Sequence, residues 1–142
     1  MAYYSRKFNM PFQAVVEKIT ENLAHHGFGV ITTIDVRDTF KRKLNVGFRN
    51  YKILGACNPT LAYKAITLES HIGVMLPCNI VVQEHENGET EVTAINPLEA
   101  LDKAFNTTQL ADLATEIGIR LRAAVDYIHR EEPKINHDAL PV

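Results

Sequence analysis

Hydrophobic and polar residues follow two different periods along this chain, and each change of period marks a change of element. Residues 2–9 alternate with a period of two, which predicts a first strand. Gly27 is predicted to end the helix that comes next, as a left-handed C-cap residue. The apolar face of that helix follows the 3.6-residue period and is expected to pack on a sheet; it consists of Phe12, Val15, Val16, Ile19 and Leu23.

Two further strands with a short helix between them are predicted in the next part of the chain. Residues 28–34 are rich in β-branched residues, which favours a strand, and residues 48–57 are predicted to form the third strand. A four-residue spacing of apolar side chains from residue 36 to 44 predicts an amphipathic helix that Asn45 or Gly47 ends. We interpret the basic run at 41–43 as a solvated helix face, with a small anion-binding patch as the alternative. It has too little excess charge and too few aromatic residues for nucleic-acid binding.

The direction of the fourth strand depends on the segment that precedes it. Asn58 as N-cap and Pro59 at the first helical position predict a helix directly after the third strand. A second short segment at residues 69–75 then leads to Pro77. If the two segments fold back on each other, the strand from Cys78 runs antiparallel to the third strand, whereas a single crossover would make the two parallel. We favour the antiparallel arrangement, which would bring the sulfur atoms of Cys57 and Cys78 close together.

A hairpin is predicted at residues 78–86 and 89–96, because Asn87-Gly88 is a preferred two-residue type I′ turn. Such a loop fixes the register, so that Ile80 lies opposite Ile95 and Val82 opposite Thr93. We interpret the acidic tip as exposed and protective against edge pairing, with a site for a hard divalent cation as the alternative. In this register the glutamates of the tip share one face as two opposed pairs, Glu86 with Glu89 and Glu84 with Glu91.

The remaining chain is predicted to be helical and then irregular. Asn96-Pro97 starts a short helix, and Asn106 with Gln109 resembles a capping box for a long helix that ends near His129. We therefore expect one α+β domain at residues 1–130 and a flexible C-terminal tail at 131–142. The fold class is α+β, with a mainly antiparallel sheet of about five strands, helices packed on one face and a long C-terminal helix.

Size and composition favour a self-sufficient globular domain. The chain has 142 residues, of which 46% are hydrophobic and 23% charged, and its net charge is −2. A chain of this length buries about two thirds of its unfolded surface without help from metals or disulfides. The N-terminus shows no secretory signal and no apolar run is long enough to span a membrane, so we expect a cytoplasmic protein. Membrane and nucleic-acid partners are not expected, and both cysteines should be free thiols.

Three segments resemble a known family: residues 51–62, 72–79 and 94–97 are similar to the domain-of-unknown-function 302 family. The first two segments contain the Cys57-Asn58 and Cys78-Asn79 pairs, and the likeness extends over residues 3–128. The resemblance implies a small intracellular α+β domain, dimeric and without an established activity. It supplies no catalytic residues.

Candidate chemistry is confined to the two Cys-Asn pairs. The sequence has no Gly-rich phosphate loop, nucleophile elbow or paired-His metal motif, so we expect a binding protein rather than an enzyme, and no cofactor is indicated. The function predicted is a non-catalytic small-ligand-binding or assembly module, a homodimer with ligand-binding residues Cys57, Asn58, Cys78 and Asn79. The alternative is thiol redox chemistry or soft-metal binding at the two cysteines, with His71 as a weaker third ligand. Buried cysteines that only fill space are the opposing interpretation.

Overall fold

The computed structural model describes residues 2–101, 105 and 107–138, with side chains described as far as Ile128. Its five strands form one antiparallel sheet in the order β1-β5-β4-β3-β2. The predicted α+β fold with a long C-terminal helix is confirmed. The strands are β1 (Tyr3–Phe8), β2 (Gly29–Asp35), β3 (Tyr51–Cys57), β4 (Cys78–Glu84) and β5 (Thr90–Ile95). The helices are α1 (Phe12–His25), α2 (Val36–Leu44), α3 (Pro59–Leu68), the 3-10 helix η1 (Ser70–Met75), α4 (Pro97–Ala100) and α5 (Thr108–Asp138).

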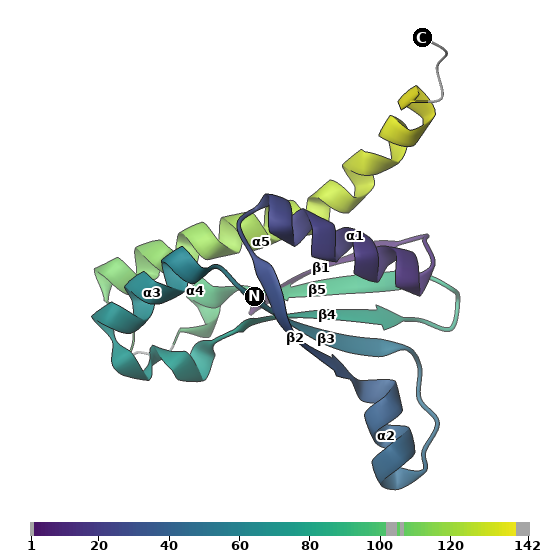
Figure 1. The fold of residues 1–142 in the computed structure, drawn as a ribbon, viewed down its shortest axis with the longest axis horizontal. Coiled ribbons are helices and arrows are strands. Elements are labelled where there is room, and N and C mark those ends of the chain that lie inside the picture. The colour runs from purple at the N-terminus through teal and green to yellow at the C-terminus, as the bar shows by residue number, and fades with distance from the viewer. Residues whose placement is uncertain (1, 102–104, 106, 139–142) are drawn as a thin grey trace.

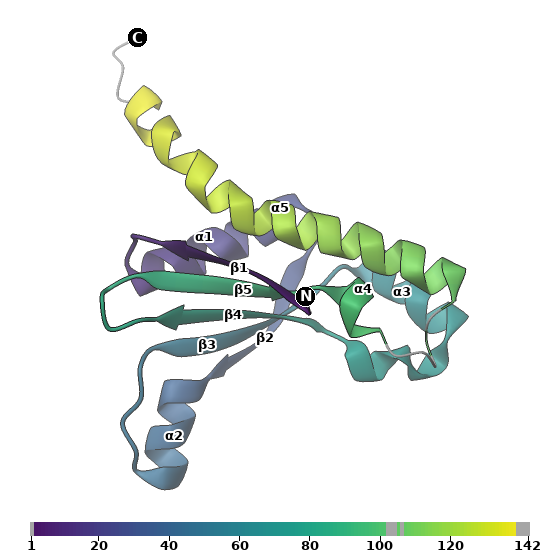
Figure 2. The ribbon, with the colours of Figure 1, turned by 180° about the vertical axis from the view of Figure 1, so that it is seen from behind.

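Helices α1 and α5 lie side by side on one face of the sheet, as predicted (Figure 1). Alternate strand residues point into the layer between sheet and helices, because successive side chains of a strand face opposite ways. Leu54 and Ile80 from the sheet are thereby buried against α1 and α5. Seen from behind, α3 and α4 each contact α5 and lie beyond one end of the sheet, beneath the N-terminal half of α5 (Figure 2).

The opposite face of the sheet is open along its centre, and we call it the bare face. Ile34 lies opposite Ile53, and Ile53 lies opposite Val81, so three aliphatic side chains form a row across three strands. Ile34 is 49% exposed, and Ile53 and Val81 are half-buried. An antiparallel sheet that faces water on one side usually carries polar residues there, so this row is unusual.

Helix α2 projects from the end of the sheet and contains no buried residue (Figure 1). Asp35 caps its start by accepting a hydrogen bond from the Asp38 amide at 3.0 Å. The left-handed Asn45 (φ 53°), one of the two residues predicted to end the helix, is its C-cap. Residues 35–52, which we call the basic arm, hold six Lys or Arg and two Asp, a net charge of +4. With −2 overall, the rest of the chain carries −6.

The predicted register of the β4–β5 hairpin is wrong by one residue. Glu84 lies opposite Thr90 and Ile80 opposite Ala94. Three residues, rather than two, separate His85 from Glu89: the Gly88 amide donates to the His85 carbonyl at 2.9 Å, and Gly88 has φ 89°. A glycine in the left-handed region after a turn is the usual way to close a three-residue hairpin loop. A shift of one residue turns side chains that would have shared a face of the sheet to opposite faces. The two opposed glutamate pairs therefore do not form.

The C-terminal helix is longer than predicted. Helix α5 continues to Asp138 instead of ending near residue 129, and Pro133 falls inside it. The flexibility of residues 131–142 stays a prediction, and 139–142 lie outside the described residues. Asn106, the predicted cap, lies outside them too; at the helix start the Thr107 hydroxyl accepts from the Leu110 amide at 3.3 Å.

Candidate functional site

The predicted pair of neighbouring thiols is not confirmed. Strands β3 and β4 are antiparallel, as expected, but Cys78 lies opposite Ala56 rather than Cys57. Alternation along the strand directs Cys57 towards the bare face, where it is half-buried. Cys78 is 5% exposed and lies on the covered face, the side of the sheet that α1 and α5 pack against. Both cysteines are free. The two sulfur atoms therefore belong to opposite sides of the sheet.

The other predicted site residues do not converge on the cysteines. Asn58 is buried as the cap of α3, where its Oδ1 accepts from the Leu61 amide at 3.1 Å. Asn79 is exposed on the bare face, opposite Gly55. The ring of His71 lies at the surface, 2.8 Å from a carboxylate oxygen of Glu69. Among the described residues, no group of three His, Cys, Asp or Glu is placed to hold a metal ion.

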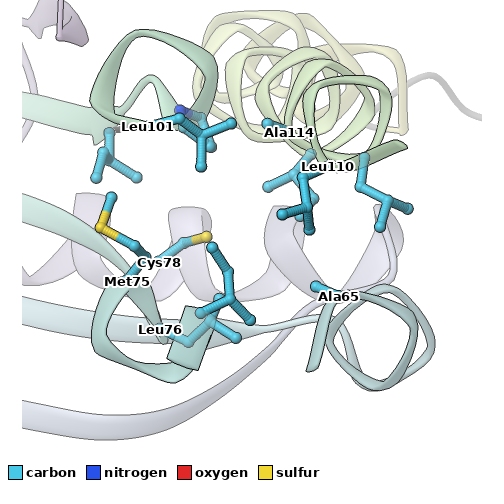
Figure 3. Close-up of a pocket in the computed structure, with 12 residues that line it drawn as sticks. Ala65, Met75, Leu76, Cys78, Leu101, Leu110 and Ala114 are labelled. Carbon is cyan, nitrogen blue, oxygen red and sulfur yellow. The ribbon is translucent and has the colours of Figure 1, made fainter. Parts of the chain in front are cut away.

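Cys78 instead borders a small apolar cavity at the end of the sheet (Figure 3). The cavity has a volume of about 40 Å³. In Figure 3, Met75 and Cys78 lie on one side of it, and Leu110 and Ala114 of α5 lie on the other. Burial raises the pKa of the Cys78 thiol to about 11, with a smaller electrostatic contribution from Cys57 across the sheet. The thiol is therefore protonated at neutral pH, and the cavity offers water few hydrogen-bond partners.

A second and larger hollow, which we call the Arg122 pocket, lies between the β1–β5 edge of the sheet, α4 and α5. Its volume is about 190 Å³. Tyr4 forms part of its wall and is held in place by Asp126 of α5, to which the Tyr4 hydroxyl donates at 2.5 Å. Arg6 Nη1 lies 3.1 Å from the same carboxylate oxygen. Burial and the hydrogen bond to Asp126 both raise the pKa of Tyr4, so its hydroxyl stays neutral.

Arg122 gives this pocket its charge. Its guanidinium carbon lies 4.3 Å from the centre of the Tyr4 ring, a cation–π contact. Asp126 is occupied by Tyr4 and Arg6, and within the described part of the chain Arg122 makes no ion pair. The remaining wall is mostly apolar and includes Ile95, Leu98, Ala114 and Ile119. The pocket thus combines an exposed guanidinium, which makes no ion pair among the described residues, with a mostly apolar wall.

Sequence reasoning missed this pocket because no local motif marks it. Arg122 has the spacing of an outward-facing helix residue, and Tyr4 that of an ordinary strand residue. They meet only because β1, at the edge of the sheet, packs beside α5, 118 positions further along the chain. Ile95 and Ala114 line both this pocket and the cavity at Cys78, so the two hollows share a wall.

Comparison with known proteins identifies the family. The chain belongs to the family described as "Domain of unknown function DUF302", whose model matches residues 4–128, which confirms the resemblance seen in the three segments.

One solved structure shows the same fold along nearly its whole length. The chain is similar to the crystal structure of an uncharacterized conserved protein DUF302 from Bacillus stearothermophilus, with 29% sequence identity and a TM-score of 0.81. The match covers 89% of this chain and 97% of that chain. No curated protein matches. Of the helices in the described residues, none combines the length and apolar character needed to cross a membrane.

Proposed function

We propose that this protein is a non-catalytic binding protein for a small organic carboxylate, which it holds in the Arg122 pocket. The observation that supports this is the guanidinium of Arg122, which has no carboxylate partner among the described residues and lines a largely apolar hollow. The proposal keeps the predicted class, a small-ligand-binding module, but moves the site from the Cys-Asn pairs to Tyr4 and Arg122.

The chemistry of the wall selects the ligand. A guanidinium is planar and binds a carboxylate through two parallel hydrogen bonds, which makes arginine well suited to this group. The apolar side chains around it favour a ligand with a hydrocarbon body. A volume of about 190 Å³ lies below the roughly 300–1,000 Å³ of pockets for drug-sized ligands, which favours a small ligand.

Calorimetric titration with butyrate tests the proposal, with n-butanol as the uncharged analogue. We expect butyrate to bind and n-butanol not to bind measurably. Arg122→Met should weaken butyrate binding at least about tenfold, because a hydrogen bond to a charged group contributes about 1.5–3 kcal/mol. Arg120→Met is the matched control, since Arg120 lies on the same helix but pairs with Glu116 at 2.7 Å. Equal butyrate binding by the wild type and Arg122→Met, or none by either, would contradict the proposal.

The alternative, thiol redox chemistry or soft-metal binding at Cys57 and Cys78, is less favoured by this geometry. The two thiols lie on opposite sides of the sheet, and the raised pKa of Cys78 leaves little of the reactive thiolate. In the reducing cytoplasm, where we place the protein, both should stay reduced. Titration with a thiol reagent, at a protein concentration low enough to keep the protein monomeric, should modify Cys57 in the folded protein and Cys78 only after denaturation. Rapid modification of both native thiols would instead favour the redox function.

We also propose that the protein is a homodimer in which a second copy covers the bare face. The row formed by Ile34, Ile53 and Val81 provides apolar surface, and the basic arm can meet the acidic remainder of a second copy. Sedimentation at several protein concentrations tests this. Val81→Asp should give a monomer, whereas Val74→Asp, at a position 78% exposed on η1, should leave the dimer intact. A monomeric wild type, or a Val81→Asp dimer, would refute the interface.

A further inference from the structure

The Arg122 pocket and the cavity at Cys78 lie on two sides of one thin wall. Ile95 and Ala114 line both hollows. Alanine is the smallest side chain that a wall can carry apart from glycine, and Ile95 is only half-buried. A change of the Ile95 rotamer is the kind of side-chain adjustment that commonly accompanies binding. A ligand that reaches from one hollow into the other needs such a change, which joins them into one elongated site.

We infer that the ligand is an unbranched aliphatic carboxylate whose head group binds Arg122 and whose chain passes Ala114 into the cavity at Cys78. This inference rests on the proposed function and adds the chemical class of the ligand. The charged end of the combined site lies at Arg122 and Tyr4, and the other end is apolar. That polarity matches a molecule with one anionic end and one hydrocarbon end.

The cavity suits a hydrocarbon chain better than any polar group. Its wall consists of aliphatic and thioether side chains, with Cys78 as the one titratable group, and the thiol stays protonated. Dry apolar cavities of this kind bind apolar guests. Each methylene group that enters should raise the affinity about fourfold, which is the effect of burying one CH₂. The gain in affinity must stop after a few methylene groups, because the cavity has a volume of only about 40 Å³.

A chain-length series tests the inference by calorimetry: butyrate, hexanoate, octanoate and dodecanoate on the wild type and on Arg122→Met. We expect octanoate to bind at least about tenfold more tightly than butyrate, since only a few of the added methylene groups fit. Dodecanoate should bring no further gain. Arg122→Met should weaken binding of every member of the series.

Two variants with opposite effects locate the chain in the cavity. Ala65→Leu fills the cavity from α3 and should abolish the gain from butyrate to octanoate while butyrate binds as before. Cys78→Ala enlarges the cavity and should shift the best chain length upward, and it keeps the experiment decisive if Ala65→Leu does not fold. Ala62→Leu, on the same helix but away from the cavity, is the matched control.

The outcomes separate this inference from the proposed function. If butyrate binds through Arg122 but affinity does not rise with chain length, the site is a carboxylate pocket alone and the chain inference is wrong. The chain inference is equally wrong if both cavity variants show the wild-type chain-length profile. If Arg122→Met binds every carboxylate as the wild type does, or if no carboxylate binds, the proposed function fails as well.

Discussion

The two faces of the sheet are made from alternate residues of the same strands, yet they differ sharply in what covers them. Ile80 and Val82 on the covered face are fully buried beneath α1 and α5. Their neighbour Val81, on the bare face, is half-buried and lies in the row with Ile34 and Ile53. Two residues that are adjacent in the sequence therefore meet opposite environments, and a pair such as Cys78-Asn79 is not one site.

Substitution of one isoleucine on each face should show the largest difference. Ile80→Ala leaves a cavity in the core and should lower the free energy of unfolding by about 4 kcal/mol. Ile53→Ala removes the same atoms from the bare face and should cost less than about 1 kcal/mol in the monomer. Urea unfolding of both variants measures the two values.

The same pair of variants sharpens the comparison if a second copy covers the bare face. The loss in free energy of unfolding caused by Ile53→Ala should then increase with protein concentration, because the dimer dissociates when it unfolds. Equal costs for Ile80→Ala and Ile53→Ala at low concentration would mean that the two faces do not differ as described.

The second largest effect should come from the ionisation of Cys78. Its pKa is about 11 in the folded protein, against about 8.5 for a thiol in an unfolded chain. The folded state holds this proton more tightly than the unfolded state does. The contribution of Cys78 to the free energy of unfolding is therefore fully present below about pH 8.5 and is lost as the pH rises through about 11. The loss attributable to Cys78 approaches about 3 kcal/mol.

Unfolding in urea across this alkaline range, under reducing conditions, gives the measurement. Cys78→Ala is the reference, because it retains every other alkaline titration. A wild type and a Cys78→Ala variant that lose the same free energy between neutral pH and pH values near 11 would show that the thiol is not buried as described.

The smallest effect concerns the two asparagines that follow the cysteines. Asn58→Ala removes the cap of α3 and a buried amide, so it should cost about 1–2 kcal/mol. Asn79→Ala changes an exposed side chain on the bare face and should stay within about 0.5 kcal/mol. Thermal unfolding of the two variants measures this difference. Equal decreases in melting temperature would contradict the assignment of Asn58 as a helix cap and of Asn79 as a surface residue.

Most of the fold follows from periodicity and helix caps in the sequence. Gly27 and Asn45 end their helices in the left-handed region, and Asn58 starts α3, each as predicted from residue type. The antiparallel direction of β4 also follows, from the two short segments that return the chain. The register of the β4–β5 hairpin does not, because Asn87-Gly88 fits both a two-residue and a three-residue loop, and only packing selects between them.

The candidate site could not be predicted in the same way. Its charged end depends on Tyr4 and Arg122, which approach each other only when the edge strand β1 packs beside α5. Its apolar end contains Cys78, which the sequence did single out, but for its chemistry rather than for the cavity that it borders. Sites built from distant segments on different elements leave no local spacing to detect.

The basic arm has a consequence for how the molecule behaves in an electric field. Positive charge is concentrated at one extremity, with +4 in residues 35–52, and the rest of the chain carries −6, so the protein has a substantial electric dipole despite its small net charge. Such a molecule aligns as it approaches a charged surface. It should adsorb through its arm to a cation-exchange resin at pH values where its net charge alone would predict repulsion.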